Sequence, residues 1–342
     1  MRIFVVLNVA LSFVIFLVYF IFNQSWYAEM LLSGLWHLCL LFTVSSLATI
    51  WFSKHRLRFS SLVAPLLLIV CFVDANVAQW RKPFLSTKHY KELADTKAEY
   101  RLITIAQHNT SNWSAETDRI IGWIHSIAKQ TDIIFLIEVN KDFRQILRDK
   151  FIEDFPHRII DPNPNKRGQV LFSKLPIQEY QFIESVDPHR DPDLLAVLSP
   201  PMQTDGKYNE QWLFVGIHPH APVSQRWFDL RNQGYEKYTK LIQHWPDKPL
   251  IIAGDFNATQ YNYWFRKIRR DFDLTFRTNL LGTAPSFVPK ISAITIDHLL
   301  HSKHWRTVDR QVGEFYGGAH STVVTRLAWH HSTIVTTLAW QH

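Results

Sequence analysis

The sequence predicts an α/β layered domain that follows a group of membrane-spanning helices. From about residue 100 onward, short runs of β-branched and aromatic residues alternate with segments of helical periodicity and with turn residues, a pattern typical of α/β domains. The first eighty or so residues, in contrast, are almost entirely apolar. A chain of 342 residues has room for both parts. We therefore expect an anchor over residues 1–83 and an α/β domain over residues 98–330.

Three apolar stretches make up the anchor, over residues 3–22, 31–52 and 61–80. Each is about 20 residues long, the length that a helix needs to cross about 30 Å of hydrocarbon. The first two contain no Asp, Glu, Lys or Arg, whereas the third contains Asp74 near its end and has an interfacial helix as its alternative. A cleaved signal peptide is the competing interpretation of the first stretch, but the apolar run exceeds the usual core of about 7–15 residues and no small-residue cleavage site follows it.

The loops between these stretches predict an orientation. The loop between the second and third stretches contains Lys54, Arg56 and Arg58, whereas Glu29 is the charged residue between the first and second. Because basic loops stay in the cytoplasm, three spans would carry the α/β domain to the extracytoplasmic, periplasmic side. Basic residues between positions 81 and 91 favour the opposite orientation.

Charge and cysteine usage narrow the classes of partner. A net charge of +7 and a pI near 9.3 favour contact with phosphates, either of nucleic acid or of anionic lipid. The two cysteines, Cys39 and Cys71, lie inside apolar stretches. This usage excludes a disulfide framework and a thiolate metal site.

Seven apolar runs predict the buried strands of the α/β domain. They cover residues 101–106, 132–139, 168–173, 212–218, 249–257, 295–302 and 321–329. Helical spacing of apolar residues predicts helices over residues 116–130 and 223–245. Residues 320–330 are nearly repeated at residues 331–341. We interpret residues 331–342 as a duplicated tail beyond the domain, without a functional interpretation.

Polar residues that could act in catalysis or metal binding stand where these strands end. Asp255 and Asn257 follow the apolar run at residues 250–253, and alternation along a strand would turn both side chains toward the same side. An ordinary strand-end turn is the alternative interpretation. Other strand ends supply an acid or a histidine each: Glu138, His218 with His220, Asp297 with His298, and His320. Such a set suits a hard, oxygen-ligated cation with histidines nearby, while His220 and His298 are interpreted as packing or surface residues.

Six short motifs occur in an order that resembles the endonuclease/exonuclease/phosphatase family. They are DIIFLIEV, GQVLFSKLP, FVGIHPHAP, IIAGDFNAT, TIDHLLHS and GGAHSTVV. The resemblance covers about residues 98–330 and implies a four-layered sandwich of two β-sheets flanked by helices, with the site at one rim. It also implies a phosphoester hydrolase, a nuclease or a phosphodiesterase or phosphatase, that uses Mg²⁺ or Mn²⁺.

The resemblance also implies the roles of the residues. Glu138 would bind the metal ion, together with Asn109 as our choice among Gln107, Asn109 and Asn112. Asp255 would orient or deprotonate the attacking water, and Asn257 would hydrogen-bond to the phosphate. His320 would stabilise the charge at phosphorus, with its tautomer fixed by Asp297. His218 would be a second phosphate contact or the leaving-group acid.

Three departures from the family pattern leave a second function open. Ile137 stands where the family usually has Gln, the spacing after the first strand is irregular, and Ala319 stands where the Ser-Asp-His motif has Asp. Alanine neither binds a metal ion nor accepts a proton. The leading hypothesis is a membrane-tethered phosphoester hydrolase, and the alternative is a catalytically impaired phosphate-binding or scaffold domain. A small transporter is the weakest hypothesis. Transport sites normally place ionisable groups inside the membrane, and of the Asp, Glu, Lys and Arg residues only Asp74 lies in the predicted spans.

The choice of substrate stays open at this stage. A nucleic acid would use a basic groove with stacking aromatics, which Lys166, Arg167 and Trp264 could supply. A membrane tether instead favours a phospholipid or inositol phosphate, because tethering raises local concentration at the bilayer. The sequence does not indicate an oligomeric state.

Overall fold

The computed structural model describes most of the chain. The described residues are 2–52, 55–81, 102–110, 116–199, 211–246, 248–278, 281–316 and 318–329. Asn112, the duplicated tail and the side chains of the basic loop at residues 53–58 lie outside the described residues.

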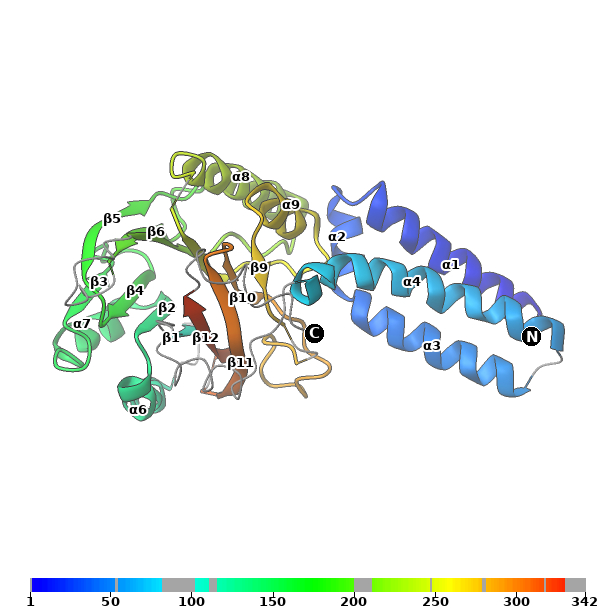
Figure 1. Ribbon diagram of the computed structural model, residues 1–342, viewed down its shortest axis with the longest axis horizontal. Coiled ribbons are helices and arrows are strands. Elements are labelled where there is room, and N and C mark those ends of the chain that lie inside the picture. Colours follow the sequence, from blue (N-terminus) through cyan, green and yellow to red (C-terminus); the bar gives the residue numbers. More distant parts are fainter. Residues whose placement is uncertain are drawn as a thin grey trace, which may run out of the picture.

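Four N-terminal helices form a bundle that extends from one side of the molecule (Figure 1). They are α1 (Arg2–Phe20), α2 (Trp26–Ser33), α3 (Leu35–Phe52) and α4 (His55–Arg81). The second predicted span, residues 31–52, is interrupted at Gly34, whose main-chain N–H bonds to carbonyls of α2 and ends that short helix. In the part of the chain that the structure describes, three helices are long and apolar enough to cross a membrane, over Arg2–Phe20, Leu35–Phe52 and Phe59–Val77.

The surface of the bundle is apolar. Ile3, Val6 and Trp51 are 76%, 65% and 82% exposed, and they belong to a much larger set of exposed apolar side chains on these helices. Soluble monomers rarely expose contiguous apolar surface of this kind. The bundle is therefore suited to a lipid environment.

Two six-stranded mixed sheets form the centre of the domain that follows the bundle. The first has the order β11-β12-β1-β2-β4-β3 and the second has the order β5-β6-β7-β8-β10-β9. The strands of the first sheet are β1 (Leu102–Asn109), β2 (Ile133–Val139), β3 (His157–Ile160), β4 (Gly168–Ser173), β11 (Trp305–Phe315) and β12 (Ser321–Trp329). Those of the second are β5 (Ile177–Ile183), β6 (Asp193–Leu198), β7 (Trp212–Ile217), β8 (Leu250–Asp255), β9 (Thr275–Phe276) and β10 (Asp297–His301). Each of the seven predicted strands corresponds to one of these elements.

The sheets pack face to face, with a helical layer on each outer side (Figure 1). Between the sheets, the Phe135 ring on β2 meets the Phe214 ring on β7 at a centroid distance of 5.4 Å. Helices α8 (Gln225–Ile242) and α9 (Tyr263–Asp271) cover the second sheet. Helices α6 (Thr117–Ile127), continued by the 3₁₀ turn η1 (Ala128–Gln130), and α7 (Lys141–Asp149) cover the first. The predicted α/β sandwich is confirmed, with four layers.

A side chain from one sheet clamps the other at the rim where the strands end. Gln107 on β1 accepts a hydrogen bond of 3.1 Å from the main-chain N–H of Gly254 on β8 and donates one of 3.5 Å to its carbonyl. Gly254 has a φ of 141°, and an added Cβ there would lie 2.1 Å from the carbonyl oxygen of Ile217. The position therefore requires glycine, and the clamp places Asp255 beside Asn109.

The bundle and the sandwich share a buried interface. Glu29 on α2 forms an ion pair with Arg231 on α8, and both side chains are fully buried. Arg266 on α9 lies 3.9 Å from the centroid of the Tyr19 ring and donates a 3.0 Å hydrogen bond to the Tyr19 carbonyl. The bundle is thus packed onto the layer formed by α8 and α9.

Candidate active site

The seven residues proposed from the sequence lie at ends of strands on one rim of the sandwich. Asn109, Glu138 and Asp255 stand at or next to the last residue of β1, β2 and β8. His218 and Asn257 follow β7 and β8, Asp297 begins β10, and His320 directly precedes β12.

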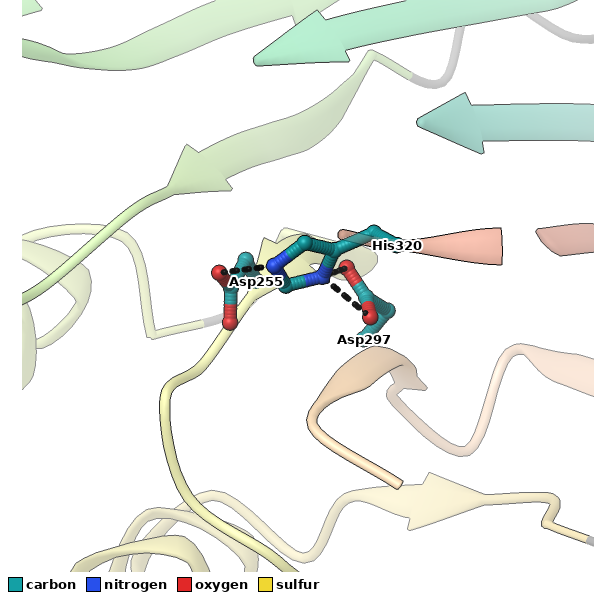
Figure 2. A group of neighbouring side chains, drawn as sticks. All are labelled: Asp255, Asp297 and His320. Atoms are coloured by element: carbon teal, nitrogen blue, oxygen red, sulfur yellow. Dashed lines mark hydrogen bonds and ion pairs between the residues drawn. The ribbon is translucent and has the colours of Figure 1, made fainter. Parts of the chain in front are cut away.

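Asp255, Asp297 and His320 form a buried cluster (Figure 2). Asp297 lies opposite Asp255 in the antiparallel pair of β10 and β8. Nδ1 of His320 lies 2.9 Å from Oδ2 of Asp297, and Nε2 lies 3.7 Å from Oδ2 of Asp255. The imidazole is therefore held between two acids, with one ring nitrogen directed at each.

The charges in this cluster support one another. Burial lowers the pKa of His320, but the negative charges of Asp297 and Asp255 outweigh burial and raise this pKa to about 10. Burial raises the pKa of Asp297, but the charge and hydrogen bond of His320 outweigh it and leave the pKa below its ordinary value. The pKa of Asp255 is raised, mainly by burial. His320 is therefore a cation at neutral pH.

Asn109 joins this cluster to Glu138. Its Nδ2 atom lies 3.1 Å from Oδ2 of Asp255 and 3.2 Å from Oε1 of Glu138. Gln107, the competing candidate, is engaged with Gly254 in the clamp between the sheets. Asn109 is thus the amide that contacts both acids in the described part of the site.

Glu138 lies against a histidine and an arginine. It has a φ of 57°, a left-handed conformation that turns its side chain away from the regular course of β2. Nε2 of His218 lies 3.2 Å from its Oε1 atom, and Arg167 pairs with its Oε2 atom. Burial raises the pKa of Glu138, but the hydrogen bond and charge of His218 and the charge of Arg167 outweigh burial and lower this pKa below its ordinary value. Glu138 is therefore ionised.

His218 lies between the two acidic groups. Its Nε2 atom is 3.7 Å from Oδ2 of Asp255, besides its contact with Glu138. The Nη2 atom of Arg190 is 2.8 Å from the same Nε2 atom, and the main-chain N–H of His218 donates a 2.6 Å hydrogen bond to Asp193. The loop after β7 thus holds this ring in the centre of the site.

Asn257 reaches the site by a different route from the one predicted. Strand β8 ends at Asp255, so alternation along a strand does not orient Asn257. Instead, Asn257 adopts a left-handed conformation with a φ of 46°, and its N–H donates a 2.8 Å hydrogen bond to Oδ1 of Asp255. Its carbonyl accepts a 3.0 Å hydrogen bond from Arg231.

His298 and His220, which flank the candidate residues in the sequence, lie outside the cluster. His298 is buried against Phe256 and Phe265, and burial, together with the charge of Arg310, lowers its pKa to about 3. His220 lies 3.3 Å from Asp187, and its ring is tilted relative to that of Trp227 at a centroid distance of 5.5 Å. Neither belongs to the Asp255 cluster.

Three residues of the site were not found from the sequence. Arg190 contacts His218, Arg231 holds the Asn257 carbonyl, and the Thr283 hydroxyl accepts a 3.2 Å hydrogen bond from the Asp297 N–H. None belongs to a strand-end motif, and only tertiary packing brings them to the rim. At Ala319, where the family has Asp, the main-chain carbonyl accepts a 2.8 Å hydrogen bond from Ser286.

The donors at the rim fit a divalent cation. Asp255, Asp297 and His320 place possible ligand atoms within 4.8 Å of one another, but His320 is a cation whose ring nitrogens face the two acids. The ionised Glu138, beside the Asn109 amide, is therefore the carboxylate that suits a metal ion. The Asn109 amide can present either its nitrogen or its oxygen to the site. Carboxylate and amide oxygens suit Mg²⁺ and Mn²⁺, and buried carboxylates require compensating positive charge.

A four-layered sandwich with acids and histidines gathered at one rim defines the class of DNase I-like folds. A model of the endonuclease/exonuclease/phosphatase family matches residues 106–328, which is well over half of the chain, and the chain belongs to this family. The resemblance stated from the six motifs is therefore confirmed. No curated protein sequence matches the chain significantly.

Solved structures share the fold at low sequence identity. An endonuclease/exonuclease/phosphatase family protein from Bacteroides thetaiotaomicron is 16% identical with a TM-score of 0.52, covering 68% of this chain and 100% of that one. The human Nocturnin catalytic domain with a bound sulfate anion is 16% identical, with a TM-score of 0.51 and coverage of 68% and 97%. TDP2 from D. rerio, complexed with a single-stranded DNA product, is 13% identical, with a TM-score of 0.52 and coverage of 66% and 98%.

Proposed function

We propose that the protein is a divalent-metal-dependent phosphoester hydrolase tethered to a membrane. The observation that carries this proposal is the position of Asp255, which lies between a histidine held by a second acid and an amide that reaches Glu138. A nucleophilic water, a phosphoryl group and a metal ion would each be bound by a different residue of this group.

Glu138 and Asn109 would hold Mg²⁺ or Mn²⁺. Bound there, the cation would neutralise phosphate charge. Asp255 accepts a proton from the attacking water, in keeping with its raised pKa. The water oxygen forms a bond to phosphorus as the bond to the leaving oxygen breaks.

The remaining side chains stabilise the phosphoryl group. The His320 cation faces the negative charge that grows on the phosphoryl oxygens, and Asp297 keeps the ring oriented through Nδ1. His218 contacts the phosphate or donates the proton that the leaving oxygen requires. The Asn257 amide, which donates to the Pro219 carbonyl at 3.0 Å and to Oδ2 of Asp255 at 3.4 Å, would exchange one of these acceptors for a phosphoryl oxygen.

The membrane tether rests on the three long apolar helices, and the basic loop near residue 55 supports an extracytoplasmic domain. Labelling of an Ile152→Cys variant in intact cells by a membrane-impermeant maleimide tests the side, because Ile152 is exposed on the sandwich. Protection from the reagent in intact cells but not in lysed cells would place the domain in the cytoplasm.

The activity is tested with the full chain in detergent and a chromogenic phosphodiester and phosphomonoester. We expect turnover with Mg²⁺ or Mn²⁺ that EDTA abolishes, and a loss of about 10²–10⁴-fold for Asp255→Asn, as for removal of a general base. Asp118→Asn, at an exposed position on α6, is the matched control. Glu138→Gln should also abolish the rise in Tm that Mn²⁺ causes. Metal-independent turnover, or an Asp255→Asn variant as active as Asp118→Asn, would contradict the proposal.

Ala319 supports a second candidate, an impaired domain that binds phosphate without hydrolysing it. Ala319→Asp restores the carboxylate of the family motif. A large gain in turnover would favour the impaired form, whereas high turnover in the unchanged protein excludes it.

A further inference from the structure

We propose that the substrate of this site is an anionic membrane phospholipid, taken from the surface of the bilayer that the anchor spans. This inference rests on the proposed function and names its substrate class. Two loops carry it, because each holds a histidine of the site at one end and contacts the bundle at the other.

Aromatic residues mark the level of the bilayer surface on the bundle. Trp26 and Tyr27 begin α2, Trp36 lies in the first turn of α3, and Trp80 lies in the last turn of α4. Tyr27 and Trp80 are 76% and 52% exposed. Tryptophan and tyrosine concentrate at membrane–water interfaces, so the interface crosses the bundle where it meets the sandwich.

The first loop, residues 219–224, follows His218. The indole N–H of Trp26 donates a 2.7 Å hydrogen bond to the carbonyl of Pro222. Val223 beside it and Trp227 in the first turn of α8 are 67% and 40% exposed. Within a few residues, the chain thus runs from the centre of the site to the level of the aromatic residues.

The second loop, residues 281–296, is bonded to the turn that carries His320. The N–H of Ser286 donates a 2.8 Å hydrogen bond to the carbonyl of Ala319, and its hydroxyl donates one of 2.6 Å to the carbonyl of Gly318. Phe287 and Ile291 are 73% and 53% exposed. The Ile291 carbonyl lies 3.1 Å from Nε2 of His37 at the start of α3. This loop, too, reaches the level of the aromatic residues.

The exposed apolar side chains of the sandwich gather on these loops. Among the described residues from 102 to 329, the large apolar side chains that are well exposed are Ile146, Ile152, Tyr180, Val223, Trp227, Leu281, Phe287 and Ile291. Five of these eight belong to the two loops or to the start of α8. A soluble substrate does not explain why the exposed apolar side chains gather there, whereas insertion of these loops into the membrane interface does.

Two cavities match the two halves of an anionic phospholipid. One, of about 350 Å³, lies between the bundle and the sandwich and is lined by Trp36, Phe72, Trp80 and Tyr261, together with Thr259 and Thr295. The last two stand two positions from Asn257 and Asp297 in the sequence. The other, of about 440 Å³, is polar and is lined by Lys141, Lys166, Arg167 and Arg190. It adjoins the proposed metal site, because Arg167 pairs with Glu138 and Arg190 contacts His218.

The reaction arm of the test uses the full chain reconstituted in phosphatidylcholine nanodiscs. Phosphatidylglycerol, phosphatidic acid and phosphatidylinositol phosphate are compared with the soluble phosphoester of the same headgroup and with a DNA oligonucleotide. We expect a kcat/KM for at least one anionic lipid that exceeds that for its soluble counterpart by about tenfold or more. Phe287→Asp should lower lipid hydrolysis about tenfold and leave hydrolysis of the chromogenic ester unchanged. Tyr180→Asp, exposed on β5, is the matched control.

The geometry is tested separately from the reaction. An environment-sensitive dye on Phe287→Cys, in a background of Cys39→Ala and Cys71→Ala, should be quenched by brominated lipids, whereas a dye on Tyr180→Cys should not. Absence of quenching at residue 287 overturns the proposal, as does equal or better hydrolysis of soluble esters or DNA. If no ester of any kind is hydrolysed with Mg²⁺ or Mn²⁺, the proposed function fails as well.

Discussion

At the scale of single residues, the chemistry depends on charges that are paired in a buried setting. His320 keeps its proton because Oδ2 of Asp297 lies 2.9 Å from its Nδ1 atom and Asp255 lies beyond its Nε2 atom. The His320 cation in turn stabilises the two carboxylates, since burying an unpaired carboxylate costs free energy. One imidazole therefore serves both to stabilise the site and to face the substrate.

Asp297→Asn should separate these effects. The pKa of His320 is raised to about 10 in the folded protein, so its cation persists as the pH rises through neutrality. Without the Asp297 charge this pKa falls, and activity should then decline at a lower pH than in the unchanged protein. We also expect kcat at neutral pH to fall by about 10²-fold, the effect of losing one transition-state contact. A kcat–pH profile checks both, and an unshifted descending limb would contradict the role of Asp297.

At the scale of elements, the rim depends on a close approach of two strands. Gly254 on β8 lies against the Ile217 carbonyl on β7 while Gln107 holds it from the other sheet. This arrangement leaves no space for a side chain at Gly254, the residue before Asp255. The position of the proposed base is therefore set by the main chain.

Gly254→Ala should destabilise the fold by about 2 kcal/mol or more, through strain in the left-handed region and a clash with main chain. Gly122→Ala on α6 is the matched control, because its Cβ would meet nothing within 4 Å. That change should be neutral or stabilise the protein by about 0.5–1 kcal/mol. Thermal unfolding of both variants in the same detergent measures the difference, and equal Tm values would show that the strands can separate at no cost.

Seven strands and their polar ends could be predicted from the sequence because both signals are local, whereas the fully buried β6 was missed. An apolar run followed by Glu138 or Asp255 is visible in a window of ten residues. Strand β5 was missed, because it is an edge strand whose middle residues are polar and exposed, and α9 was missed because an apolar stripe is short among basic residues. The contacts of Arg190 and Arg231 join residues far apart in the chain, so no local pattern could indicate them.

At the scale of the whole molecule, the N-terminal helical bundle is part of the structure that holds the site. Glu29 from the bundle pairs with Arg231, and Arg231 in turn donates to the carbonyl of Asn257. Asn262 adds a 3.2 Å hydrogen bond to the Glu29 carbonyl. A charge from the bundle thus lies two contacts away from the proposed phosphate ligand.

Glu29→Ala should therefore lower both stability and activity. Removing one partner of a buried ion pair costs about 3–5 kcal/mol, because the other charge is left buried and unpaired. Glu153→Ala, at an exposed position, is the control. Tm and the KM for the chromogenic ester are measured together: a normal Tm in Glu29→Ala would show that Arg231 does not need its partner.

The order of strands in the first sheet has a consequence for biosynthesis. Strand β12, the last of the described strands to leave the ribosome, lies in the sheet interior between β11 and β1, and His320 directly precedes it. Until this segment has been made, β1 has one edge without a partner and the rim lacks the His320 cation. A nascent chain arrested before His320 should consequently be protease-sensitive, and the proposed hydrolysis could begin only after the domain has been completed.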